Sequence, residues 1–182
     1  MVKKEKSTHK KALIQLLKSL VLWVILVGVV THPAIKGVVK EAMINFTGSG
    51  VEFVCNLLHI PVHISGYPYI SIFHFQMEIL YECSAYNYYL LVISLSVFAL
   101  WPWKNKIING LIMLLIIFMM NSLRFIMMGY IGKYHYTLFD SIHNYFWNIF
   151  FALLLLLMWV WLGESGEKAY IKKLAAVSGK RP

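Results

Sequence analysis

The fold is decided by residues 107–131, which read IINGLIMLLIIFMMNSLRFIMMGYI. Arg124 is the single charged side chain in this run, which exceeds the roughly 20 apolar residues that a helix needs to cross a bilayer. Apolar residues make up 59% of the chain, and the mean hydropathy is +0.66. We therefore predict an all-α polytopic membrane protein, a single membrane domain over residues 1–182. It has about four transmembrane helices, at residues 12–30, 84–101, 107–131 and 142–162.

Basic residues are distributed unevenly between the ends of these helices. Of the 17 Lys and Arg, 13 lie in the tail 1–11 with Lys18, in the loop 104–106 and in the tail 163–182. The positive-inside rule then places both termini in the cytoplasm, in the plasma or inner membrane, and residues 31–82 on the outer face. Because membrane orientation and contact with anionic lipid account for the net charge of +9, no nucleic-acid partner is predicted.

The first apolar stretch, residues 12–30, has two interpretations. A basic start followed by an apolar run is typical of a signal peptide. The run is long for that role, however, and Thr31, His32 and Pro33 follow it instead of a small-x-small cleavage site. We therefore favour an uncleaved membrane anchor.

Residues 31–82 have a different pattern from the apolar stretches. Residues 33–60 are typical of a short amphipathic helix, which the stretch Gly48-Ser49-Gly50 is expected to break. Residues 61–80 alternate between apolar and polar around Tyr67-Pro68-Tyr69, which predicts a β-hairpin-like segment. Because hydrocarbon does not tolerate unpaired strand edges, we place this segment at the outer interface.

Three polar side chains are expected at one depth near the outer face. Cys83 lies 18 residues before Trp101, Arg124 lies 17 residues after Ile107, and His143 lies 18 residues before Trp161. At about 1.5 Å per residue, each is then roughly 26–27 Å from the inner boundary of its helix. Because the chain direction alternates between these helices, a thiol, a guanidinium and an imidazole can meet at one level.

Such a trio is suited to acyl transfer. A nearby cation favours the nucleophilic thiolate of a cysteine and stabilises an oxyanion, and a histidine moves protons near neutral pH. Asn121, one turn before Arg124, can orient the guanidinium or add a donor. Each residue also has a plainer interpretation: a small apolar filler for Cys83, a side chain reaching the headgroups for Arg124, and an interfacial residue for His143.

Three short motifs resemble the exosortase/archaeosortase family of membrane-embedded cysteine transpeptidases, over roughly residues 60–155. That family has a Cys-Ser-Gly motif opening one helix, an Asn-x-x-Arg motif late in the next and a His opening the one after. Ala85 stands where Gly is usual, and four spans are fewer than many members have. The matching segments are Glu82-Cys83-Ser84-Ala85, Asn121-Ser122-Leu123-Arg124-Phe125 and Ser141-Ile142-His143-Asn144 with Tyr145-Phe146-Trp147.

The resemblance implies an enzyme that cleaves secreted proteins near the outer membrane face. Its substrates would carry a C-terminal signal made of a short motif, a transmembrane helix and a basic cluster, and the new C-terminus would pass to a lipid or glycan acceptor. Cys83 would be the nucleophile, Arg124 the thiolate or oxyanion stabiliser and His143 the proton shuttle. Asn121, Glu82 and Ser84 would support them, and no cofactor or metal is implied.

Other functions remain open from the residues alone. A thiol–quinone oxidoreductase would need Cys55 as the partner of Cys83. A non-catalytic assembly or scaffold subunit would use the aromatic clusters at 86–89 and 145–147 as partner surfaces. A transporter is disfavoured because no Asp or Glu lies within the predicted spans. Glu78 is a candidate substrate contact, Asp140 is the expected N-cap of the last span, and metal or haem binding would draw on His59, His63, His74, His135 and His143.

Overall fold

The computed structural model describes the backbone of residues 2–99 and 101–178, and the side chains of residues 13–99, 101–143 and 145–162. Lys180 and Arg181 of the predicted basic tail lie outside the described residues. The elements in chain order are α1 (Val2–Val30), α2 (Pro33–Leu57), β1 (Val62–Gly66), β2 (Tyr69–Ile72), β3 (Phe75–Glu78), the 3-10 turn η1 (Tyr81–Ser84), α3 (Tyr86–Phe98), α4 (Trp103–Tyr134), α5 (Tyr136–Ser141), the π-helical turn η2 (Ile142–Phe146) and α6 (Trp147–Ser178).

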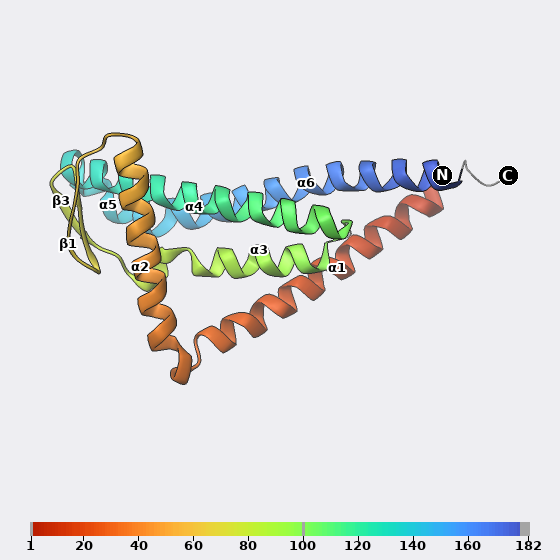
Figure 1. Ribbon diagram of the computed structural model, residues 1–182, viewed down its shortest axis with the longest axis horizontal. Coiled ribbons are helices and arrows are strands. Elements are labelled where there is room, and N and C mark those ends of the chain that lie inside the picture. The colour runs from red at the N-terminus through yellow and green to blue at the C-terminus, as the bar shows by residue number, and fades with distance from the viewer. Residues whose placement is uncertain (1, 100, 179–182) are drawn as a thin grey trace.

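The helices form an elongated bundle with a crosswise cap. In Figure 1, α3, α4 and α6 run lengthwise, α1 approaches them obliquely, and α2 crosses them. The sheet and α5 lie at one end, whereas the start of α1 and the end of α6 lie at the other (Figure 1). The tails predicted for the cytoplasmic side therefore share one end, and the sheet predicted for the outer side lies at the opposite end.

Among the described residues, two helices are long and apolar enough to cross a membrane, through Leu13–Val30 and Trp103–Tyr134. The apolar part of α6, Trp147–Leu162, is shorter. The predicted span 84–101 is helical only over Tyr86–Phe98, because the backbone is left-handed at Ala85 and extended at Ala99. At about 1.5 Å per residue, α3 alone is shorter than a ~30 Å hydrocarbon core. The four-span topology stays a prediction.

Helix α2 continues unbroken through Gly48-Ser49-Gly50, so the expected break is wrong. Other elements approach the two glycines of this stretch closely. A Cβ on Gly48 would collide with the Tyr67 ring, and one on Gly50 would lie 2.5 Å from the Phe118 ring. The two glycines therefore let α2 pack against the β1–β2 turn and against α4, and packing outweighs their low helix propensity.

The segment expected as a hairpin folds as a three-stranded antiparallel sheet of order β1-β2-β3. The predicted second arm is two strands, because Phe73 and His74 both have positive φ and reverse the chain there. No glycine marks this turn, so the alternating pattern concealed it. The apolar side chains of Ile70 and Ile72 are fully buried and turn one face of the sheet toward the helices.

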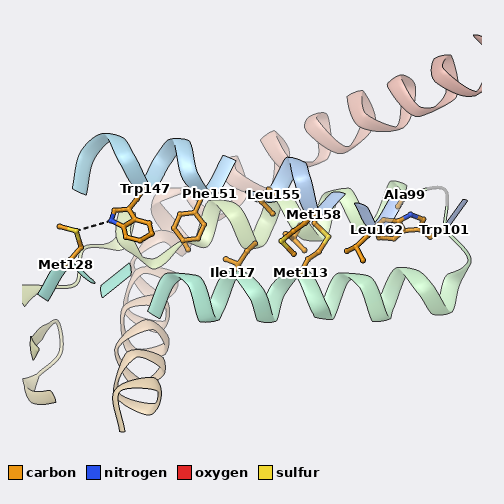
Figure 2. Packing of buried hydrophobic residues seen from close by; sticks show 12 residues of the cluster. Ala99, Trp101, Met113, Ile117, Met128, Trp147, Phe151, Leu155, Met158 and Leu162 are labelled. Atoms are coloured by element: carbon orange, nitrogen blue, oxygen red, sulfur yellow. Dashed lines mark hydrogen bonds between the residues drawn. The ribbon is translucent and has the colours of Figure 1, made fainter. Parts of the chain in front are cut away.

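Two hydrophobic cores hold the molecule together. The bundle core lies between α3, α4 and α6, and Figure 2 shows the α6 side chains Trp147, Phe151, Leu155, Met158 and Leu162 as one stripe along it. The Trp147 indole donates a hydrogen bond to Met128 Sδ at 3.4 Å, the dashed line in Figure 2. The cap core joins α2 and the sheet to the C-terminal half of α4, through Ile44, Val51, Val54, Cys55, Ile70, Ile72, Ile79, Cys83, Phe125 and Ile126.

Candidate active site

Cys83 lies in η1, between the sheet and α3, and only 3% of its surface is exposed. Its backbone N–H donates to the Leu80 carbonyl at 2.9 Å, and the Ser84 hydroxyl donates to the Tyr81 carbonyl at 2.6 Å. The Tyr81 ring stacks on Tyr86 with their centroids 4.2 Å apart. These contacts hold the turn closed and fix the backbone around the thiol.

Ala85 links this turn to α3 in a left-handed conformation, with φ 58° and ψ 16°. Its side chain is buried, and the residue both ends η1 and precedes the first turn of α3. A glycine adopts this conformation freely, whereas alanine does so at a cost of about 1–2 kcal/mol. The backbone turn, rather than space for a side chain, therefore explains why glycine suits this position.

Arg124 approaches the thiol from α4. It is 6% exposed, and its Nη2 donates to Cys83 Sγ at 3.7 Å. Among the described side chains, Arg124 interacts electrostatically with Cys83, Tyr88 and His143, and none of these is a carboxylate. A buried guanidinium normally has an anionic partner, because desolvating the charge is costly. Its placement here suits an anion that forms only during a reaction.

His143 approaches the same sulfur from η2, with its Nε2 3.4 Å from Cys83 Sγ. Its ring stacks on Phe139, one turn earlier, at 5.8 Å between centroids and an interplanar angle of 6°. The buried Nδ1 has no hydrogen-bond partner among the described residues. When the thiol donates to Nε2, Nδ1 carries the proton and the ring is the neutral acceptor that a general base requires. π-Helical turns recur at functional sites.

The thiol is protonated at rest. Burial raises the pKa of Cys83, the Arg124 guanidinium lowers it in part, and the charge of Glu82 raises it further. Burial is the largest of these effects, so the neighbouring cation does not by itself produce a standing thiolate. Forming a thiolate would therefore require a proton acceptor, and His143 Nε2 lies 3.4 Å from the sulfur.

The predicted supporting residues lie close by but do not all make the expected contacts. Asn121 is buried, and its Oδ1 has no hydrogen-bond partner among the described residues, so it does not accept from the guanidinium of Arg124. Glu82 and Glu78 are exposed and are not among the groups that interact with Arg124. Asp140 lies inside α5 instead of capping the last span, because helical structure continues from Tyr136 into α6.

The remaining predicted ligands are dispersed. His59, His63, His74 and His135 are exposed, and no group of three or more His, Cys, Asp or Glu suited to a metal occurs within the part of the chain that the structure describes. Cys55 is a free, fully buried thiol of the cap core, and burial raises its pKa to about 11. Such a thiol is inert compared with one beside a cation.

Two residues of the site were not predicted. Tyr88 interacts electrostatically with Arg124 and stacks on Phe151 at 5.0 Å between centroids. Phe139 supports the imidazole of His143. Spacing offered a signal for Phe139, which precedes His143 by four residues, or about one helical turn. Tyr88 is one of several tyrosines at the start of α3, and nothing in the sequence distinguishes it from them.

A comparison with known protein families identifies the family of this chain. A protein-family model described as transmembrane exosortase matches residues 8–163, a range that includes Cys83, Arg124 and His143. No curated protein and no solved structure is significantly similar to the chain. Because the match extends over most of the sequence and the apolar helices fit a membrane protein, the chain belongs to the transmembrane exosortase family.

Proposed function

We propose that this member of a family of membrane cysteine transpeptidases uses Cys83, Arg124 and His143 to cleave C-terminal sorting signals of secreted proteins near the outer membrane face. The new C-terminus passes to a lipid or glycan acceptor. The observation that carries the proposal is the position of one sulfur, 3.4 Å from an imidazole nitrogen and 3.7 Å from a guanidinium nitrogen. A nucleophile, a proton acceptor and a fixed cation are the groups that acyl transfer needs.

The reaction follows from these three contacts. Cys83 Sγ attacks the scissile carbonyl carbon while its proton passes to His143 Nε2, and the oxyanion is stabilised by Arg124. The C–N bond then breaks, His143 returns the proton to the leaving amine, and a thioester remains on Cys83. An acceptor hydroxyl or amine gives its proton to His143 and attacks the thioester. The thiolate of Cys83 leaves and regains the proton.

The shape of the molecule supports an outer-face site on a multi-pass protein. Cys83 adjoins the sheet and the cap core, which lie away from the start of α1 and the end of α6 (Figure 1). The excess of Lys and Arg in those tails favours the cytoplasm for them. A substrate with a short motif, a transmembrane helix and a basic cluster would then present its scissile bond at the level of Cys83.

The test is co-expression of the full chain with secreted proteins from its own genome that carry such a three-part tail. Intact-mass and peptide mass spectrometry follow the C-terminus of each candidate. We expect processing by the wild type, none by Cys83→Ala, and a loss of about 10²–10⁴-fold for His143→Ala. Processing that continued at the wild-type rate in a folded, abundant Cys83→Ala protein would contradict the assignment of the nucleophile.

Cys55→Ala is the matched control for the other thiol. Cysteine transpeptidation needs one sulfur, so this variant should process the substrate as the wild type does. A thiol–quinone oxidoreductase needs two exchanging thiols, so loss of activity in both cysteine variants would favour that function instead. The mass of the processed product also identifies the acceptor.

A further inference from the structure

Strand β3 has an edge that no other strand in the described part of the chain covers. It is the last strand in the order β1-β2-β3. Ile79 N–H donates to the Pro68 carbonyl at 2.8 Å, and Glu78 pairs with Tyr69 in register. Backbone groups of an antiparallel strand alternate between its two edges. The N–H and C=O groups of Phe75, Met77 and Ile79 therefore face β2. The N–H and C=O groups of Gln76 and Glu78 therefore face outward.

These outward groups are unpaired in the part of the chain that the structure describes. No backbone hydrogen bond outside the strand pairing involves Gln76 or Glu78, and both residues are exposed. An open row of donors and acceptors is a template for another extended chain. Peptide-binding domains use such edges, where main-chain hydrogen bonds supply affinity and side-chain contacts supply specificity.

The edge leads directly to the thiol. Glu78 precedes Cys83 by five residues, with η1 between them. Alongside, α5 leads through η2 to His143. Strand β3 touches α5 where the Phe75 and Phe139 rings are 5.4 Å apart. Farther along the chain from each of these, Cys83 Sγ faces His143 Nε2. A strand added beside β3 would therefore extend the sheet over α5 and η2 and end at the catalytic pair.

The direction of that strand also follows. Phe75 lies against Gly132, eight residues and about 12 Å along α4 from Arg124, so β3 runs from the outer end of α4 toward the level of the site. A sorting signal runs the same way, because its transmembrane helix follows the cleaved motif. We propose that Gln76 and Glu78 bind the extended recognition motif of the substrate as an added strand parallel to β3 and deliver its scissile bond to Cys83. This inference rests on the proposed function.

The first arm of the experiment removes one backbone donor. Gln76→Pro deletes an outward N–H and blocks the edge with the proline ring, while the bonds to β2 at Phe75 and Met77 remain. Gln76→Ala is the matched control, because it changes the side chain and keeps the donor. We expect Gln76→Pro to process the co-expressed three-part-tail protein at least about tenfold more slowly than Gln76→Ala. Alkylation of Cys83 by iodoacetamide should stay within about twofold, which reports an intact site.

The second arm places a photoreactive benzoylphenylalanine at position 76 or at position 63 of β1, each in a Cys83→Ala chain. We expect the tail protein to crosslink from position 76 and not from position 63. Equal processing by Gln76→Pro and Gln76→Ala would overturn the proposal. Crosslinking of the tail protein from position 63 alone would also overturn it, as would crosslinking of a second copy of this chain from position 76. This arm decides the question if Gln76→Pro misfolds. If the tail protein crosslinked from position 76 but was still processed by the Cys83→Ala variant, the proposed function would be refuted and the binding of the substrate at the β3 edge would be supported.

Discussion

The bundle core and the cap core are built in different ways. The α6 stripe of the bundle core repeats every three or four residues along one helix, from Trp147 through Phe151 to Leu162. The cap core collects side chains from α2, the sheet and α4, and it depends on close approaches at glycines. One core therefore follows from local periodicity, and the other depends on contacts between segments that are distant in sequence.

The candidate site lies at the boundary between these two cores. Cys83 belongs to the cap core, and Ala85, two residues later, belongs to the bundle core. Arg124 on α4 and His143 on η2 reach the thiol from helical segments. The helices thus supply a fixed frame for Arg124 and His143, while the cap positions Cys83. The two cores should fail in different ways when disturbed.

The largest effect on stability is expected in the bundle core. Phe151 is fully buried between helices and stacks on Tyr88, so Phe151→Ala leaves a cavity. We expect the free energy of unfolding to fall by about 3 kcal/mol. The control Leu153→Ala removes a side chain that is 54% exposed, and it should change stability by less than about 0.5 kcal/mol. Thermal unfolding in detergent compares them, and equal losses would contradict this packing.

The frame can be tested at Arg124 without removing its charge. Arg124→Lys keeps a cation but loses the planar guanidinium. In the wild type, one N–H of that group donates to the Cys83 sulfur and the others remain available for an oxyanion. We expect processing of the tail substrate to fall by about 10²–10³-fold, the usual effect of losing one oxyanion donor. The melting temperature of the variant provides the control. Near wild-type turnover would mean that Arg124 acts as a point charge only.

The cap should respond to a smaller change at Gly129. A Cβ there would lie 2.8 Å from the Ile72 Cβ and 3.2 Å from the Ile72 carbonyl oxygen, so Gly129→Ala pushes the sheet away from α4. We expect a loss of about 1–3 kcal/mol in stability. Gly37 in α2 has open space around it, and Gly37→Ala should stabilise by up to about 1 kcal/mol. Chemical denaturation of both variants checks the opposite signs.

The pH dependence of alkylation measures the pKa of Cys83, at the boundary between the two cores. Iodoacetamide reacts with the thiolate, and burial raises the pKa of Cys83. In a Cys55→Ala chain, the labelling rate should therefore rise with pH and reach half its maximum above the value of about 8.5 for a free thiol. Arg124 lowers this pKa, so Arg124→Gln should move the midpoint higher still. A midpoint below that of a free thiol would contradict the protonated resting state.

The sequence predicted the elements that local patterns control. Counting residues from the inner ends of three helices indicated that Cys83, Arg124 and His143 could meet, and the distances at the sulfur agree with that juxtaposition. Their chemical roles stay predictions.

The cap was harder to predict, because tertiary contacts override local signals there. Gly48 and Gly50 break helices by propensity but serve here as contact points for Tyr67 and Phe118. Phe73 and His74 turn the chain without glycine. The resting protonation of Cys83 depends on how deeply the fold buries it, which spacing does not reveal.

The smallest expected effect is at the boundary itself, where Ala85 carries a left-handed backbone with φ 58°. Ala85→Gly relieves about 1–2 kcal/mol of strain, but it gives up a buried methyl and loosens the unfolded chain, so the net change should be within about 1 kcal/mol. Ala85→Val places a β-branched side chain in the same conformation and should destabilise clearly. Melting temperatures, with Cys83 labelling alongside, compare the two. If Ala85→Gly lost as much stability as Ala85→Val, the buried methyl group rather than the backbone turn would determine how η1 joins α3. If only Ala85→Val loses stability and labelling, the left-handed turn aims the nucleophile, and glycine or alanine can each provide it.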